Sequence, residues 1–210
     1  MFLSRFQIDT NKINARLALA NQNVFHGAVA RQFEVGRRVL WRVDDLGGKK
    51  YLLLVSEDKP ELHGLVEQFG AEGTDMTRDY DALLSRCEPG TRWLFRLVAN
   101  PTYAYREQKY ARGKVRPHLG LEHQMEWLLR KAKEHGFAVS QGSFRVTGSQ
   151  WVALQRQKGK GGFSKLLAVT YEGELTVTDK EKFITALTCG IGREKAFGMG
   201  MMTVISGRSR

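Results

Sequence analysis

Histidine is the side chain in this sequence best suited to moving a proton near neutral pH, because an imidazole titrates there. The chain has five histidines: His26, His63, His118, His123 and His135. No two of them have H-E-x-x-H or another metal-binding spacing, so the sequence predicts no metal site. His26 lies in NVFHGAV, where Phe25 and Val29 are expected to anchor a helix in the core. From these residues alone, a structural role for His26 is favoured over a catalytic one.

A glycine-rich segment, CGIGREKAFGMGMM (residues 189 to 202), raises the question of a nucleotide site. Its glycines are Gly190, Gly192, Gly198 and Gly200. They match neither G-x-G-x-x-G nor G-x-x-x-x-G-K-[S/T]. A helix is expected before the segment and a strand after it, which is the reverse of the order that both nucleotide loops need. The segment is therefore not predicted to hold a mononucleotide.

The charge of the chain points to a nucleic-acid partner. Lys plus Arg number 33 and Asp plus Glu number 22, which gives a net charge of +11 and a pI near 9.8. Basic residues gather in three places, and aromatic side chains alternate with them in the second, a combination that suits base stacking and phosphate contact. The three places are Arg37, Arg38, Arg42, Lys49 and Lys50; residues 102 to 118; and Arg156, Lys158, Lys160 and Lys165.

The elements that must position these residues follow one pattern twice. Alternating strands are expected at 2–8, 39–43, 51–55 and 93–99, and helices at 23–34, 61–69, 121–135 and 180–189. A weaker strand within 77–84 and strands at 152–157, 166–171 and 201–205 complete two βαββαβ units, with Thr178 and Glu181 at capping-box spacing before the last helix. This order predicts an α+β protein with two antiparallel sheets and a break near residues 88–90, between domains at 1–88 and 91–210.

The remaining composition excludes several classes of protein. No apolar run approaches the ~20 residues of a membrane helix, and MFLSRFQIDT lacks the pattern of a cleavable signal peptide. Cys87 and Cys189 have no C-x-x-C spacing, which argues against a zinc site or a disulfide framework and for a reducing cytoplasm. No signature of a serine or cysteine nucleophile or of paired catalytic carboxylates is present.

Several stretches together resemble the CasE (Cse3) family of CRISPR RNA-processing endoribonucleases of type I-E Cascade. They are MFLSRFQI, HGAVARQF, LFRLVANP, HQMEWLLRKAKEHGF, KLLAVTYEGELTV and GIGREKAFGMGMMTV, and they span nearly the whole chain. The resemblance implies two tandem ferredoxin-like, RRM-like domains. It also implies metal-independent cleavage of a repeat RNA at the base of its stem-loop, which leaves 5′-hydroxyl and 2′,3′-cyclic phosphate ends and needs no cofactor. The enzyme would keep the crRNA and join the other Cascade subunits.

The resemblance also assigns site residues. The catalytic histidine of the family falls on His26, while Asn23 stands where relatives often have a tyrosine. Arg31, about 140° from His26 round a helix, is a weaker candidate unless its side chain bends back. The RNA-gripping hairpin falls on Arg156, Lys158, Lys160 and Lys165. The glycine loop becomes a backbone element for RNA and for domain packing, with Arg193 and Lys195 as candidate phosphate contacts.

Two other functions remain open from the sequence. The absence of the tyrosine at Asn23 is compatible with a non-catalytic RNA-binding subunit of the same superfamily, in which His26 only packs. A DNA-binding architectural protein would also be basic, but it would bind duplex DNA and be indifferent to a 2′-deoxy substitution in RNA.

Overall fold

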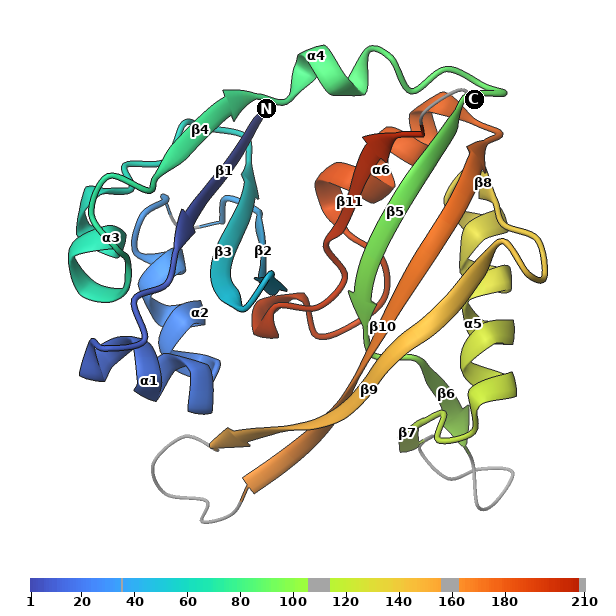
Figure 1. The fold of residues 1–210 in the computed structure, drawn as a ribbon. Helices are drawn as coiled ribbons and strands as arrows, with labels where there is room; N and C mark the ends of the chain where they lie inside the picture. Colours follow the sequence, from blue (N-terminus) through green and yellow to red (C-terminus); the bar gives the residue numbers. More distant parts are fainter. Residues whose placement is uncertain (35, 106–113, 156–162, 208–210) are drawn as a thin grey trace.

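The first half of the chain folds into a four-stranded antiparallel sheet with helices on one side (Figure 1). We describe a computed structural model, which defines residues 1–34, 36–105, 114–155 and 163–207. The strands are β1 (Phe2–Gln7), β2 (Val39–Leu46), β3 (Lys49–Ser56) and β4 (Met76–Asp79), in the order β2-β3-β1-β4. The helices are α1 (Ile13–Ala20), α2 (Asn23–Ala30), α3 (His63–Phe69) and the short α4 (Asp81–Leu84). This strand order is that of a βαββαβ ferredoxin-like unit.

The alternation in the sequence explains the first sheet. In β1 the side chain of Phe6 is buried and that of Arg5 is exposed, and Ile8 is buried just beyond the strand. The turn between β2 and β3 consists of Gly47 and Gly48, both with positive φ, which glycine adopts without strain. The hairpin predicted at 39–55 is therefore confirmed.

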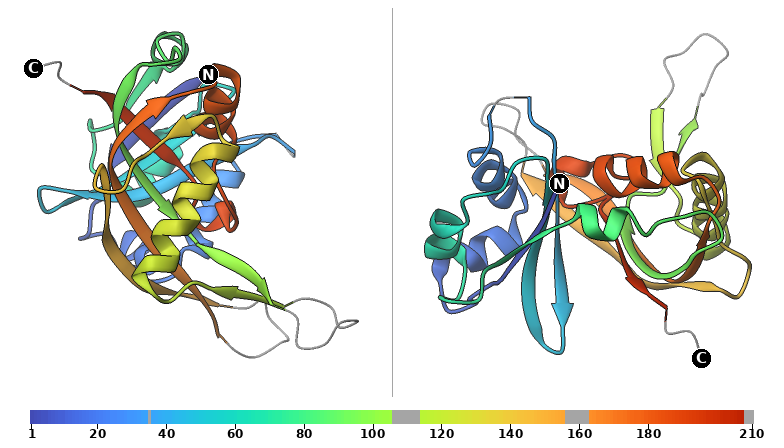
Figure 2. Two further views of the ribbon diagram at one scale, coloured as in Figure 1. Left: turned by 90° about the vertical axis from the view of Figure 1, so that its right-hand side faces the viewer. Right: turned by 90° about the horizontal axis from the view of Figure 1, so that it is seen from above.

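The second half repeats the unit with a larger sheet. Its strands are β5 (Arg92–Ala99), β8 (Phe137–Ala138), β9 (Phe144–Gln155), β10 (Phe163–Val177) and β11 (Met202–Ser206). They follow the order β11-β5-β10-β8, with β9 also paired to β10. Helix α5 (Leu121–Glu134) runs beside the sheet, and α6 (Lys180–Cys189) lies close to the junction of the two halves (Figure 2). The predicted α+β class with antiparallel sheets is confirmed.

The structure corrects several local predictions. Asp179, not Thr178, caps α6, because its carboxylate accepts a hydrogen bond from the Lys182 amide at 3.1 Å. Residues 102–118 were expected to form a loop, but they contain the paired strands β6 (Thr102–Tyr105) and β7 (Lys114–Pro117). Helix α1 was not predicted. Strands β9 and β10 are much longer than expected. They pair with each other, and the register of the pairing shifts between Thr170 and Tyr171.

The two halves share part of their apolar core. Leu40 and Val55 of the first sheet belong to the same buried cluster as the strands and helices of the second half. Tyr80, the residue before α4, and Leu84, the last residue of α4, also belong to that cluster. Because apolar side chains from both sheets are buried together, the halves are held in a defined relative position. Among the described helices, none has the length and apolar character needed to cross a membrane.

Candidate nucleic-acid interface

His26 lies on the exposed side of α2 at the junction of the two halves. Helix α2 is anchored by the buried Phe25 and Val29, as predicted, and the Phe25 ring contacts those of Trp41 and Phe69 at centroid distances of 5.8 and 5.2 Å. The His26 imidazole points the other way and is solvent-exposed. Its position on the helix surface leaves the ring accessible to a ligand.

A ring from the other half faces His26. The short helix η1 (Lys195–Phe197) follows the first two glycines of the glycine-rich segment. The Phe197 ring lies 6.0 Å from the His26 ring, centroid to centroid, at an interplanar angle of 57°. The histidine therefore stands on an N-terminal helix, and its neighbour comes from a segment about 170 residues later in the chain. The surface around His26 exists only when both halves are assembled.

Arg31 reaches back along α2. Its guanidinium Nη1 lies 3.7 Å from the point where a β-carbon on Gly27 would stand, and Gly27 is the residue after His26. Helical spacing alone places Arg31 about 140° away from His26, but its long side chain folds back over the preceding turn. Asn23 is the first residue of α2 and is half-buried, one helical turn before His26.

The glycine-rich segment is wedged between the two halves. A β-carbon on Gly198 would lie 2.8 Å from the Trp41 ring, and one on Gly190 would lie 2.9 Å from a methyl group of Leu40. Gly192 faces the Trp127 ring of α5, 3.1 Å from its hypothetical β-carbon. The amide of Gly200 donates to the carbonyl of Val98 at 2.7 Å, while its own carbonyl accepts from Ile191 at 2.8 Å. The missing side chains let this backbone pack directly against tryptophan rings.

Cations from several elements surround this segment. Arg193 is exposed and Lys195 is half-buried on η1. Burial lowers the pKa of Lys195, as does the nearby charge of Arg38, while Cys189 opposes the shift. Burial likewise lowers the pKa of His135 at the end of α5, with Lys131 and Lys195 acting in the same direction and Glu134 opposing them. These shifts indicate that Arg38, Lys195 and His135 lie near one another beside the glycine segment.

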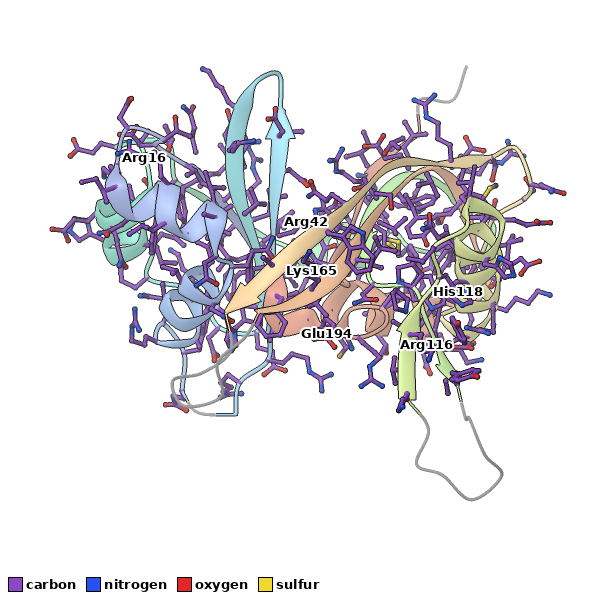
Figure 3. The ribbon with its side chains drawn as sticks, turned by 90° about the horizontal axis from the view of Figure 1, so that it is seen from below. Arg16, Arg42, Arg116, His118, Lys165 and Glu194 are labelled. Carbon is purple, nitrogen blue, oxygen red and sulfur yellow. The ribbon has the colours of Figure 1, made fainter. Side chains whose placement is uncertain are left out.

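The basic hairpin of the second half is only partly described. Lys165 is exposed on β10, where it pairs across the ladder with Ala153 of β9. Arg156, Lys158 and Lys160 lie outside the described residues. Figure 3 shows Lys165 and Glu194 in the middle of the view from below, between Arg16 on one side and Arg116 and His118 on the other.

Arg42 is not part of this basic surface, contrary to its grouping with the cations of the first hairpin. It is buried in β2 and donates from all five of its N–H groups. Two go to the Asp44 carboxylate at 2.8 and 2.6 Å, and one goes to the Thr203 hydroxyl at 2.8 Å. The other two go to the carbonyls of Arg96 and Met201 at 3.0 and 2.8 Å. The Arg42 guanidinium therefore joins the two halves, and all of its N–H groups already donate to protein acceptors and not to a phosphate.

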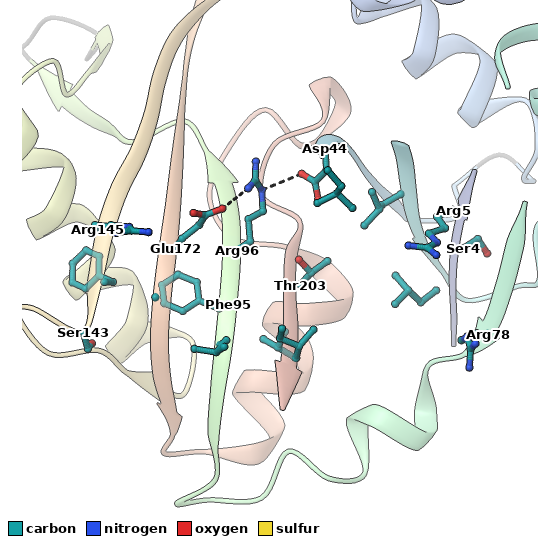
Figure 4. Close-up of a pocket in the computed structure, with 18 of the residues that line it drawn as sticks. Ser4, Arg5, Asp44, Arg78, Phe95, Arg96, Ser143, Arg145, Glu172 and Thr203 are labelled. Atoms are coloured by element: carbon teal, nitrogen blue, oxygen red, sulfur yellow. Dashed lines mark hydrogen bonds and ion pairs between the residues drawn. The ribbon is translucent and has the colours of Figure 1, made fainter. Parts of the chain in front are cut away.

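A large cavity lies elsewhere, between the two sheets. It has a volume of about 900 Å³ and a mainly apolar lining that includes Leu3, Leu53 and Phe95. Figure 4 shows Arg96 at its edge, in ion pairs with Asp44 at 3.2 Å and with Glu172. Of the sequence-predicted site residues that the structure describes, none lines this cavity.

These features define a basic α+β protein of the tandem ferredoxin-like class. They are two ferredoxin-like units, an exposed histidine at the junction of the units, and a glycine segment with cations nearby. A family model described as CRISPR associated protein matches residues 1–206, and the chain belongs to that family.

Individual relatives agree with this assignment and with the CasE (Cse3) resemblance. The chain is 29% identical over 216 residues to the CRISPR-associated endoribonuclease Cse3 of Thermus thermophilus, covering 97% of this chain and 99% of that protein. It superposes on Thermus thermophilus Cse3 bound to an RNA representing a pre-cleavage complex with a TM-score of 0.80 and 26% identity, covering 97% and 98% of the two chains. Cse3 bound to a 19 nt RNA gives a TM-score of 0.83 at 24% identity, covering 98% and 100%.

Proposed function

We propose that this protein is a CRISPR repeat-specific endoribonuclease that cleaves precursor RNA at the base of the repeat stem-loop. Family membership and the endoribonuclease name of the 29% identical relative support the reaction class. The observation that carries the proposal is the position of His26: an exposed imidazole at the junction of the halves, 6.0 Å from Phe197 and beside the cations of the glycine segment. A histidine that served only to pack the core would be buried.

The reaction we propose is transesterification within the RNA. The 2′-hydroxyl oxygen attacks the adjacent phosphorus, a new O–P bond forms, and the bond to the 5′-oxygen of the next nucleotide breaks. The products carry a 2′,3′-cyclic phosphate and a 5′-hydroxyl. One proton leaves the 2′-hydroxyl and one reaches the 5′-oxygen, and we assign one of these transfers to His26. Both the bond made and the bond broken lie within the RNA, and we propose that the reaction uses neither a metal nor a cofactor.

The cations around His26 suit the charge that develops at phosphorus. Arg31 folds back to Gly27, beside His26, and Lys195 lies on the helix that carries Phe197. We assign both to contacts with the RNA phosphates, where a fixed positive charge stabilises the additional negative charge of the transition state. Arg193 and Lys165, with Arg156, Lys158 and Lys160 outside the described residues, are assigned to the stem, whose narrow major groove favours phosphate contacts over base reading.

We further propose that the protein keeps its product and acts with other Cascade subunits. The relatives of similar fold include chains of a CRISPR RNA-guided surveillance complex, with a TM-score of 0.75 at 19% identity. Retention fits a strongly basic surface, because each neutralised phosphate strengthens binding. Cys87 and Cys189 are both free, which supports placing the protein in a reducing cytoplasm.

A second function is favoured by one observation. Asn23 occupies the helix position, one turn before His26, at which relatives of this family often have a tyrosine. If His26 needs that hydroxyl, the protein would bind the repeat RNA and not cut it. A non-catalytic RNA-binding subunit is therefore the alternative to be tested beside the enzyme.

The decisive experiment incubates the protein with a labelled repeat stem-loop from its own source in EDTA. We expect one cut at the base of the stem and none when the scissile nucleotide is 2′-deoxy. His26→Ala should slow the cut by roughly 10²- to 10⁴-fold, the usual contribution of general acid–base catalysis, and leave the dissociation constant of the RNA unchanged. His63→Ala, at an exposed histidine on α3, is the matched control. Tight binding without scission by the wild type would establish the alternative.

A further inference from the structure

A two-stranded ribbon outside both ferredoxin-like units carries an unusual surface. We call it the arm: β6 (Thr102–Tyr105), β7 (Lys114–Pro117) and His118, inserted between β5 and α5. Figure 1 shows it projecting from the lower end of the second sheet, on the side away from α1 and α2. A ribbon of two strands has no sheet neighbour to cover it, so its side chains face solvent or a partner.

The register of the arm places its aromatic and cationic side chains together. Tyr103 is opposite Arg116, and Tyr105 is opposite Lys114. Directly opposed residues share a face of an antiparallel pair, as do residues two apart on one strand. All four side chains therefore lie on one face, which alternates aromatic rings with cations. Thr102, Ala104, Val115 and Pro117 make up the other face.

Distances within this face show two groups of flat side chains in contact. The Arg116 guanidinium carbon lies 4.3 Å from the centre of the Tyr105 ring. The rings of Tyr103 and His118 are 4.9 Å apart, and that of His118 stacks on His123 at 5.8 Å and 12°. Burial, together with the nearby His123 and Arg130, lowers the pKa of His118, while Glu126 opposes the shift.

The base of the arm is fixed to the second half. Gln124 of α5 is 2% exposed and donates from its side-chain amide to the carbonyl of His118 at 2.9 Å. The backbone carbonyl of Gln124 in turn accepts from the Tyr171 hydroxyl of β10 at 3.0 Å. The amide of His118 donates to the carbonyl of Pro101 at 2.9 Å. The row of rings is thus held in place where it begins, while Tyr103 and Tyr105 remain 39% and 37% exposed.

We propose that this face of the arm binds unpaired nucleotides that flank the RNA stem, with bases stacked on Tyr103, Tyr105 and His118 and phosphates beside Lys114 and Arg116. Exposed aromatic rings interleaved with cations bind single strands because every base has a flat face and every linkage a negative charge. Unpaired nucleotides are favoured over a paired stem as the occupant, because the bases of a stem are already stacked on one another. The inference rests on the proposed function, since it takes the RNA as the ligand.

The test compares two RNAs that cannot be cut because the scissile nucleotide is 2′-deoxy. One is the stem-loop alone, and the other carries its single-stranded flanks. In fluorescence anisotropy, Tyr103→Leu and Tyr105→Leu should each weaken binding of the flanked RNA by roughly 5- to 100-fold, the range measured for loss of one base–aromatic stack. Binding of the stem-loop alone should not change. Tyr103→Phe and Tyr105→Phe keep the ring and should bind both RNAs as the wild type does.

Val115→Thr, on the opposite face of the same ribbon, is the matched control and should leave both affinities unchanged. Equal weakening of both RNAs by the leucine variants would overturn the inference in favour of a stem contact. No weakening of either would overturn it in favour of another partner for the arm. The proposed function fails separately, if the wild-type protein neither binds nor cuts the repeat stem-loop.

Discussion

Gly198 illustrates how single residues build this site. Its φ of +72° lies in the left-handed region, and a β-carbon there would stand 2.8 Å from the Trp41 ring. Two independent reasons therefore require glycine: the backbone conformation and the close approach of an aromatic ring from the other half. Both keep η1, and with it Phe197 and Lys195, in place next to α2.

Gly198→Ala should consequently destabilise the protein more than the same change at a glycine of similar conformation. Gly73 has a φ of +69° and nothing within 4 Å of its hypothetical β-carbon. Urea unfolding of Gly73→Ala should show a loss of about 1–2 kcal/mol, the strain of a left-handed alanine. For Gly198→Ala we expect about 2–5 kcal/mol, because overpacking against Trp41 is added. Equal losses in the two variants would mean that the contact with Trp41 contributes nothing.

For single residues, the sequence identifies the candidates, but it does not show which protein groups surround each of them in the fold. His26 was recognisable as a candidate because the family motif covers it, although its apolar neighbours favoured a structural role. Arg42 resembled the surface cations around it, and only the fold shows that five acceptors enclose it. A one-dimensional pattern cannot reveal acceptors supplied by residues more than 50 positions away. The partners of the four glycines were hidden for the same reason.

Among the elements, strands β9 and β10 carry the basic hairpin well beyond the body of the sheet. Their lengths of 12 and 15 residues exceed those predicted, because apolar alternation is visible only where one face of a strand is buried. The arm was missed as an element for a related reason: with both faces exposed, its sequence resembles that of a loop. Helix α6 was predicted with its observed ends, whereas α1 was not predicted and α2 ends at Ala30, earlier than expected.

Strand β10 supplies one described cation of that hairpin for a direct test. Lys165→Gln removes an exposed charge without altering the ladder. It should weaken binding of the repeat stem-loop and reduce the slope of log affinity against log salt by roughly one, as expected for the loss of one phosphate contact. Lys59→Gln, at an exposed lysine between β3 and α3 in the other half, should leave the slope as in the wild type. If both variants have the wild-type slope, Lys165 does not touch the RNA.

In the whole molecule, the surface around His26 forms only where the two halves are in contact. His26 and Phe197 belong to different halves, and so do Trp41 and Gly198. Arg42 and Asp44 of the first sheet bind β5 and the last strands of the second at the same junction. Any change that loosens this contact displaces the cations of the glycine segment from the histidine.

Arg42→Met should therefore cost more stability than the loss of an ordinary ion pair. It leaves the buried Asp44 with Arg96 alone, and breaking a buried pair costs about 3–5 kcal/mol. Arg37→Met is the control, since Arg37 pairs with Glu57 and Asp58 on the surface, where such pairs contribute about 0–1 kcal/mol. Thermal and urea unfolding would measure both, and cleavage by Arg42→Met should fall in parallel. Identical stabilities for the two variants would exclude a role for Arg42 in joining the halves.

The 159 residues that separate Arg42 from Met201 have a consequence for synthesis on the ribosome. At about 5–20 residues per second, the partners of Arg42 and Trp41 emerge roughly 10–30 s after these residues do. Strand β4 completes the first sheet at residue 79, so for most of that interval the sheet lacks only the surface that the glycine segment will cover. The nascent chain thus exposes Leu40 and Trp41 until the glycine segment emerges, and the surface around His26 is the last part of the protein to form.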